Sequence, residues 1–277
     1  PLEYVQEHQL PLVTLFYSID GVSGSNGCPN AEELKNFYDK MRAGAQTKTQ
    51  QASIEDTEQV FREVAQQGKD LLHIAFSSGL SGTANAARLA AENIMEEFPD
   101  RKIVVIDSLC ASLGQGLLVD YAIRQREQGK TLEETAQWVQ EHIQNLCHLF
   151  TVEDLKYLQR GGRISKTTAL VGTMIGIKPV LHVDEEGKLV PIARVRGRKA
   201  SVQALVQKME ENIGSFCQQK QTIFISHGDC LEDAKALARM VKEKFGYDDF
   251  LINNVGPTIG SHSGPGTLAL FFLGEKR

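Results

Sequence analysis

Short apolar runs followed by helical periodicity recur along the first half of the chain. Residues 71–76 and 103–106 are the clearest runs, and each precedes a turn and then a stretch with apolar residues at helical spacing, over 84–97 and 117–129. Residues 10–17 form a similar run ahead of a Gly/Ser/Asn-rich loop and another helical stretch. This order is typical of strand–helix units in a parallel sheet. We therefore predict an α/β fold whose N-terminal part contains a parallel sheet.

The pattern changes in the second half of the chain. Three further strands are predicted, at 149–152, 179–183 and 188–192. The last two flank the acidic, glycine-ended turn 184–187, which is typical of a hairpin and so indicates antiparallel pairing. We place the domain boundary at this change, with an N-terminal α/β domain over 1–148 and a C-terminal domain over 149–277.

A capping box and two amphipathic patterns predict further helices. Thr131 and Glu134 have the spacing of a capping box, which predicts a helix from there to about residue 145. Amphipathic helices are predicted at 200–213 and 230–245, with a strand at 221–226 between them. The chain therefore continues to alternate strands with helices after the hairpin.

The composition is that of an ordinary soluble protein. The 277 residues suit two domains of roughly 130 residues each. With 42% hydrophobic residues, 23% charged residues and a net charge of -5, nothing favours a nucleic-acid partner. No apolar run approaches the roughly 20 residues of a membrane span, and no export signal is present at the start. The five dispersed cysteines favour reduced thiols in the cytoplasm over disulfides or a metal site.

The turn 77–83 is the most informative segment. It reads Ser-Ser-Gly-Leu-Ser-Gly-Thr and joins a predicted strand to a predicted helix. Small residues let a ligand approach the backbone, and the free N–H groups of a helix N-terminus stabilise an anion. Ser78, Ser81 and Thr83 add hydroxyl donors. We expect an anion site here; the alternative is plain helix capping by Ser81 or Thr83.

Other segments have both a structural and a functional interpretation. Residues 256–267 are predicted as a glycine-rich loop holding His262, and a loop histidine is more often solvated than functional. The basic clusters 160–163 and 194–199 are either solvated surface or a site for a phosphate or an acidic partner. The apolar stretch 170–177 is either core or the wall of an apolar slot.

The chain lacks the sequence motifs of several enzyme classes. Ser226, His227 and Asp229 are neighbours in sequence, so they cannot form a triad by adjacency, and no G-x-S-x-G elbow is present. We interpret them as the end of a strand. The G-x-x-x-x-G-K-[ST], H-E-x-x-H and dinucleotide motifs are also absent. An autonomous kinase, oxidoreductase or zinc hydrolase is therefore poorly supported.

Taken together, the segments resemble the DegV family of fatty-acid-binding proteins, some of which are acyl-carrying subunits of bacterial fatty acid kinase. The resemblance covers most of the chain and is specific because several motifs occur in the right order. The motifs that carry it lie at 48–53, 77–83, 107–108, 114–116, 155–158, 161–164, 177–181, 196–198 and 259–266. Gln50 and Ala52 stand where the family usually has Ser and Pro, and the family's opening strand is missing before Pro1.

The resemblance implies an N-terminal parallel α/β domain and a C-terminal α/β domain with a mixed sheet, with a long-chain fatty acid between them. It assigns the carboxylate to Thr49 and Ser81, with His262 beside them. The carboxylate-binding set that we predict is Thr49, Ser81, His262, Ser78, Thr83 and Ser263. The residues predicted to contact a kinase partner or the acyl phosphate are Arg163, Arg196 and Arg198.

A simple energy comparison fits such a carrier. Burying about fourteen methylenes at roughly 0.8 kcal/mol each gives on the order of 11 kcal/mol, so apolar burial dominates affinity and polar groups mainly set orientation. The chain has no nucleotide motif, so a separate kinase subunit would phosphorylate the ligand. We predict no catalytic residue, cofactor or metal. Two alternatives remain: an enzyme acting on a small anionic substrate with His262 as general base, and an interaction module without a ligand.

Overall fold

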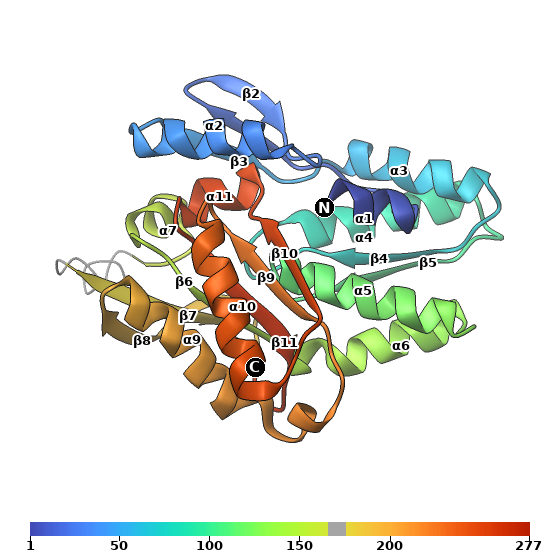
Figure 1. Cartoon of the computed structure of the whole chain (residues 1–277). Helices are drawn as coiled ribbons and strands as arrows, with labels where there is room; N and C mark the ends of the chain where they lie inside the picture. The colour runs from blue at the N-terminus through green and yellow to red at the C-terminus, as the bar shows by residue number, and fades with distance from the viewer. Residues whose placement is uncertain (166–175) are drawn as a thin grey trace.

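Three β-sheets and the helices that cover them make up residues 1–165 and 176–277, which the computed structural model describes (Figure 1). The strands are β1 (Phe16–Ile19), β2 (Val22–Ser25), β3 (Thr47–Gln50), β4 (Leu71–Ala75), β5 (Ile103–Asp107), β6 (Leu146–Thr151), β7 (Ile177–Val183), β8 (Leu189–Arg196), β9 (Ile223–His227), β10 (Phe250–Asn254) and β11 (Leu268–Leu273). The α-helices are α1 (Leu2–Glu7), α2 (Ala31–Arg42), α3 (Ile54–Gln66), α4 (Thr83–Glu97), α5 (Leu113–Glu127), α6 (Leu132–His142), α7 (Lys156–Arg160), α9 (Arg198–Ile213), α10 (Leu231–Phe245) and α11 (Pro257–Ser263). The α/β fold class is confirmed.

The two clearest apolar runs form the parallel strands β4 and β5. Their residues pair in register from Leu71 opposite Ile103 to Ala75 opposite Asp107. Figure 1 shows α3 and α4 on one face of this pair and α5 and α6 on the other. The parallel sheet predicted for the N-terminal part is therefore present, and α5 begins at Leu113, four residues before the predicted start.

The second half of the chain forms one six-stranded sheet in the order β10-β9-β11-β6-β7-β8. β9 and β10 are parallel, and every other neighbouring pair is antiparallel. β7 and β8 form the hairpin that the acidic turn predicted, and Gly187 closes the turn with a φ of +76°. The sheet is thus mixed, as the family resemblance implies.

The interpretation of residues 10–17 as the strand of a third parallel unit is wrong. The strand there, β1, starts at Phe16 and lies in a three-stranded antiparallel sheet of order β2-β1-β3. The physical reason is the pair Asp20-Gly21, whose φ angles are +48° and +83°. Two residues with positive φ turn the chain back tightly on itself, so β1 and β2 become a hairpin.

The glycine-rich segment 256–267 is also not a loop throughout, because its first half is the helix α11. Gly256 is the N-cap residue, Pro257 occupies the first turn, and Gly264 ends the helix with a φ of +81°. Proline at the start and glycine after the end are ordinary helix boundaries, so the glycines that suggested a loop mark the ends of a helix. α11 therefore holds His262 on regular backbone.

Some elements were not predicted from the pattern at all. They are α1, α3, α7, β2, β3, β10 and β11. The capping box at Thr131 is confirmed, because its hydroxyl accepts the N–H of Glu134 while the Glu134 carboxylate accepts the N–H of Thr131.

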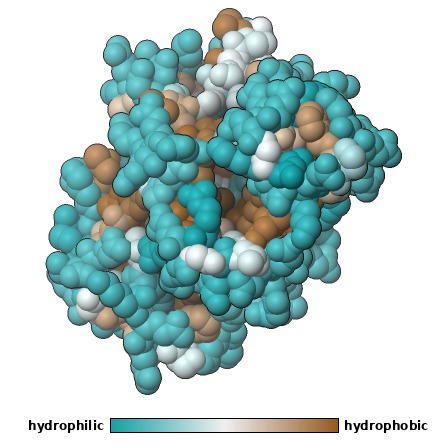
Figure 2. Space-filling model, turned by 90° about the vertical axis from the view of Figure 1, so that its right-hand side faces the viewer, coloured by the Kyte–Doolittle hydropathy of each residue, from teal (hydrophilic) through white to brown (hydrophobic). Residues whose placement is uncertain are grey.

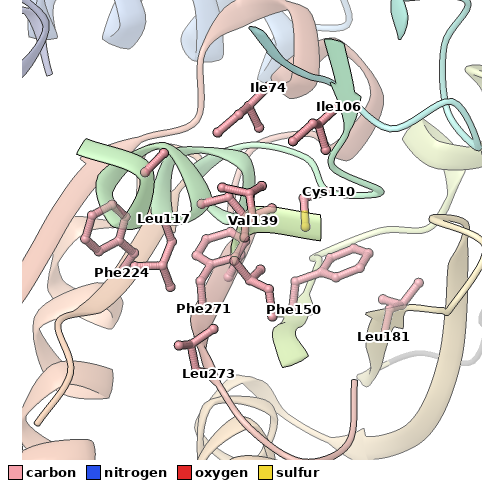
Figure 3. Packing of buried hydrophobic residues seen from close by; sticks show 14 of the residues in the cluster. Ile74, Ile106, Cys110, Leu117, Val139, Phe150, Leu181, Phe224, Phe271 and Leu273 are labelled. Carbon is pink, nitrogen blue, oxygen red and sulfur yellow. The ribbon is translucent and has the colours of Figure 1, made fainter. Parts of the chain in front are cut away.

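One apolar cluster joins the two halves of the fold. Figure 3 shows Leu117 of α5 between Ile74 and Ile106 of the parallel pair and the inner face of the six-stranded sheet, from which Phe224 and Phe271 project. The cluster thus contains residues from both sides of position 148. The opposite face of the large sheet packs against α9 and α10 through a second cluster. The domain division at 148 remains a prediction.

The side of the molecule that carries α3, α5 and α6 is mostly hydrophilic, with hydrophobic side chains in the hollows at its centre (Figure 2). Among the helices of the described residues, none has the length and apolar character that crossing a membrane requires. All five cysteines are free; Cys110 and Cys147 are buried, and Cys217 is exposed.

The turn 77–83 packs directly on the β7–β8 hairpin. The Ser77 hydroxyl donates to the carbonyl oxygen of Gly187 at 2.8 Å. A Cβ atom on Gly79 would lie 2.6 Å from the carbonyl oxygen of Glu186, which is closer than real Cβ atoms approach. Gly79 is therefore required for contact between two backbones, and the small residues of this turn are not all there for a ligand.

This contact predicts the effect of adding one methyl group. Gly79→Ala should lower the free energy of unfolding by about 1–3 kcal/mol, because the hairpin backbone cannot retreat as a side chain can. Chemical denaturation measures this. Gly27→Ala is the matched control, since a Cβ at Gly27 meets nothing within 4 Å. Equal stability of the two variants would contradict the packing argument.

Candidate ligand-binding cavity

A cavity of about 290 Å³ lies over the inner face of the six-stranded sheet. This volume is at the lower end of small-molecule sites, which begin at about 300 Å³. The walls come from the end of β3 and Gln51 after it, from the turn 77–83, from α11 and from β6, β9 and β11. Its apolar lining includes Leu15, Phe76, Leu80, Phe150, Leu158, Leu189, Ile259 and Ala269. Elements that are far apart in sequence thus enclose one mainly apolar space.

Thr49 and His262 meet in the wall of this cavity. Thr49 lies on β3 and His262 in the last turn of α11, and the Thr49 hydroxyl is 2.8 Å from His262 Nε2. Burial, with the nearby cations of Arg163 and Arg160, lowers the pKa of His262 to about 4. The imidazole is therefore neutral at pH 7. In the tautomer with the proton on Nε2, the imidazole donates to Thr49 and leaves the Thr49 hydroxyl proton free for an anion.

His262 reaches this position only because residue 161 is a glycine. A Cβ atom at Gly161 would lie 2.0 Å from His262 Nδ1. Nδ1 is buried and has no hydrogen-bond partner among the described residues. The motif glycine after α7 thus makes room for the histidine ring.

Ser81 lies in the cavity wall at the N-terminus of α4. Its hydroxyl is 2.9 Å from the Thr83 hydroxyl and accepts the Thr83 N–H at 3.3 Å. The N-cap residue of α4 is Gly82, and no side chain caps the helix there. Gly82 has no side chain, and Ser81 before it accepts the first N–H of the helix, so capping by Ser81 and an anion site are both compatible with this arrangement. The positive end of a fifteen-residue helix faces the cavity together with a serine hydroxyl.

The other predicted hydroxyls are placed differently. Ser263 lines the cavity and is 5% exposed, and its hydroxyl has no partner among the described residues. Thr83 is buried behind Ser81 and does not line the cavity. Ser78 is exposed and also lies outside the lining, with its backbone N–H donating to Asp107 Oδ1 at 3.2 Å.

Arg163 is the predicted arginine that lines the cavity. Its Nε and Nη2 donate to the carbonyl oxygen of Leu80 at 3.2 and 2.9 Å, and Nη1 donates to Gly161 O at 2.5 Å. Burial lowers the pKa of its guanidinium, which nevertheless stays protonated at neutral pH. Arg163 is thus half-buried and braces the turn that carries Ser81.

Arg196 and Arg198 lie outside the cavity. Arg196 is exposed at the end of β8. Arg198 forms ion pairs with Asp233 at 2.8 Å and Glu153 at 3.3 Å. Glu153 in turn packs on Gly266, so Arg198 lies near the turn that follows α11.

Sequence reasoning missed several polar residues in the cavity wall. They are Gln50, Gln51, Ser112, His148, Ser226, Thr258 and Thr267. The histidine had a signal, because it interrupts the apolar residues of β6. Ser226 was correctly interpreted as part of a strand end, but its place in a cavity was not foreseen. In the described residues no group of His, Cys, Asp or Glu could hold a metal ion. Most of the apolar stretch 170–177 lies outside the described residues.

Comparisons with known proteins extend over nearly the whole chain. Residues 1–275 match the family model described as uncharacterised protein, DegV family. A DegV domain-containing protein of Clostridium perfringens is 42% identical over 277 residues, which is 100% of this chain and 94% of that protein. A Thermotoga maritima protein named fatty acid-binding protein is 30% identical, over 97% of this chain and 92% of its own. A Thermus thermophilus structure, described as fatty acid binding of a DegV family protein, matches with a TM-score of 0.86 and 27% identity over 99% of this chain and 95% of its own.

The contact between Gly161 and His262 can be tested with a double-mutant cycle. The effect of Gly161→Ala on the free energy of unfolding should change with the residue at position 262. Gly161→Ala should cost about 1–3 kcal/mol of stability, because the new methyl group displaces the imidazole. In the His262→Ala background the same change should be neutral or stabilising by a few tenths of a kcal/mol, since Gly161 has an ordinary helical φ of -74°. Chemical denaturation of the four proteins gives the coupling. An equal cost in both backgrounds would show that His262 is not what the glycine accommodates.

Proposed function

The chain belongs to the DegV family, and on that premise we propose that it binds a long-chain fatty acid in the cavity over the six-stranded sheet. The observation that carries this proposal is the uneven polarity of the cavity wall. Most of the wall is apolar, while Thr49, Ser81 and His262 supply hydrogen-bonding groups to it. An amphipathic ligand with one acidic end has the same distribution of polarity.

The two parts of the wall have different energetic roles. Apolar burial of an acyl chain is worth on the order of 11 kcal/mol for about fourteen methylenes, before the cost of ordering the chain. Taking a carboxylate out of water costs several kcal/mol unless it is hydrogen-bonded. The hydroxyls, the N-terminus of α4 and the Arg163 charge offset this penalty. They therefore determine which end of the ligand lies where.

The properties of His262 favour a carrier over the enzyme alternative. A general base is most effective when its pKa lies near the working pH. The pKa of His262 is lowered to about 4 by burial, so the ring is a weak base at neutral pH. A neutral imidazole that orients the Thr49 hydroxyl suits binding better than proton abstraction.

We further propose that a separate kinase subunit converts the bound acid to an acyl phosphate. The chain has no phosphate-binding motif of its own. Arg196 is exposed at the end of β8, and such a cation suits an acidic partner surface or a transferred phosphate. We place the protein in the cytoplasm, since its five thiols are free.

Native mass spectrometry of freshly purified protein tests the first proposal. We expect an added mass equal to that of a long-chain fatty acid, and saturable uptake of stearate after delipidation. The enzyme and interaction-module alternatives predict a bare protein. A bare protein that also fails to take up stearate would refute fatty acid binding.

Substitutions of two predicted carboxylate-binding residues refine this test. Thr49→Val and Ser81→Ala should each weaken stearate binding about tenfold, because a hydrogen bond to a charged group contributes about 1.5 kcal/mol or more. Ser78→Ala, in the same turn but outside the cavity, is the matched control and should leave the affinity unchanged. Fluorescence displacement titration measures all three. Loss of affinity in the control alone would place the carboxylate elsewhere.

An assay of acyl phosphate formation tests the proposed role of Arg196. Arg196→Ala should lower acyl phosphate formation by a fatty acid kinase catalytic subunit with ATP on the order of tenfold, while the stearate affinity stays the same. Arg194→Ala is the control on the same exposed face of β8. An unchanged rate in the Arg196 variant would remove Arg196 from the partner surface.

A further inference from the structure

A buried histidine lies deeper in the cavity than the polar end does. His148 is in β6, is 4% exposed and lines the cavity. Its ring lies 4.6 Å from the ring of Phe271 and 5.6 Å from that of Phe150, measured between centroids. Nδ1 is buried without a hydrogen-bond partner among the described residues. An unpaired ring nitrogen in a buried site is costly, so it calls for a physical explanation.

The strand directions separate His148 from the carboxylate end. β6 ends at Thr151, shortly before α7 and Arg163, and β11 begins at Leu268, shortly after α11 and His262. His148 and its partner Phe271 are three residues in from those ends. At about 3.4 Å per residue, this puts His148 roughly 10 Å along the sheet from the strand ends.

A second polar group lines the cavity between the level of His148 and the strand ends. Ser226 of β9 lies opposite Ala269, which lies opposite Phe150, and all three line the cavity. Ser226 is fully buried, and its hydroxyl oxygen accepts a hydrogen bond from the Ser112 hydroxyl at 3.1 Å. The Ser226 hydroxyl proton has no acceptor among the described residues. The wall therefore offers hydrogen-bonding groups beyond the predicted carboxylate-binding set, at His148 and at Ser226.

We propose that the cavity selects an acyl chain that carries an uncharged oxygen, such as a hydroxyl group, part-way along its length, held by His148 and Ser226. This inference rests on the proposed fatty acid binding. A neutral imidazole has one donor and one acceptor, and a hydroxyl group can satisfy either. An unsubstituted chain leaves Nδ1 of His148 and the Ser226 hydroxyl proton without partners. In a wholly apolar slot, by contrast, a hydroxylated chain would lose its hydration without compensation.

The charge state of His148 fits an uncharged oxygen. Burial, with smaller effects of Arg277 and His182, lowers the pKa of His148 to about 3. The guanidinium of Arg277 donates to the carbonyl oxygens of Ile143, Val183 and Leu109. His148 is therefore neutral at pH 7 and gives a second carboxylate no ion pair.

The test compares three ligands on the delipidated full chain: stearate, stearate with a hydroxyl near the middle of its chain, and α-hydroxystearate. We expect the mid-chain hydroxy acid to bind about tenfold more tightly than stearate, since one extra hydrogen bond to a buried group is worth roughly that factor. The α-hydroxy acid should show no such gain. Competition titration gives the three affinities.

Two variants identify the groups that hold the hydroxyl. His148→Phe, which matches the flanking phenylalanines, and Ser226→Ala should each abolish the preference while stearate still binds. His182→Phe, on the neighbouring β7 and outside the cavity lining, is the control and should keep the preference.

The outcomes separate the two proposals. If the wild-type chain binds no stearate, the proposed function fails. If it binds stearate without preferring the mid-chain hydroxyl, or if the preference survives in the Ser226 and His148 variants, the inference is overturned. Should His148→Phe fail to fold, the wild-type ligand series and Ser226→Ala still decide the question.

Discussion

Burial of one apolar cluster between α5 and the inner face of the six-stranded sheet is the interaction on which the rest of the structure depends. The helix follows β5, so its apolar side chains hold the parallel pair β4–β5 against β6, β9 and β11 (Figure 3). Phe150, Leu158 and Ala269 belong to this cluster and also line the cavity. The cavity is thus the part of this apolar interface that no side chain fills. Because packed cores are stiff, its apolar wall is formed before a ligand arrives.

The polar end depends on close backbone contacts around that core. Gly79 and Gly187 let the turn 77–83 touch the β7–β8 hairpin, and Arg163 fixes the same turn through the Leu80 carbonyl. Gly161 gives His262 its place beside Thr49. The glycines that make the sequence distinctive therefore act mainly by permitting contact between segments. Their effect on the ligand comes through the side chains that they position.

Much of this arrangement could be predicted, and the failures have physical causes. The runs at β4 and β5, the hairpin β7–β8 and the capping box at Thr131 follow local rules of pattern and turn chemistry. The antiparallel sheet of β1, β2 and β3 depends on the positive φ at Asp20, which the run 10–17 does not show. Likewise, Thr49 and Ser81 were suggested by motifs, but nothing local reveals that Ser78 points away from the cavity or that His148 points into it. Those facts are set by tertiary packing between distant strands.

In the proposed complex, the distribution of charge in the cavity gives the ligand its direction. Among the described residues that line it, Arg163 alone carries a full charge, because burial keeps His262 and His148 neutral at pH 7. An acid entering the slot therefore finds one cation, one helix N-terminus and two hydroxyls at one end, and no charged group in the rest of the described wall. A carboxylate placed at the other end would lose its hydration without an ion pair, which costs several kcal/mol. In the proposed complex with a fatty acid, the apolar wall supplies most of the affinity, and this single asymmetry fixes the orientation.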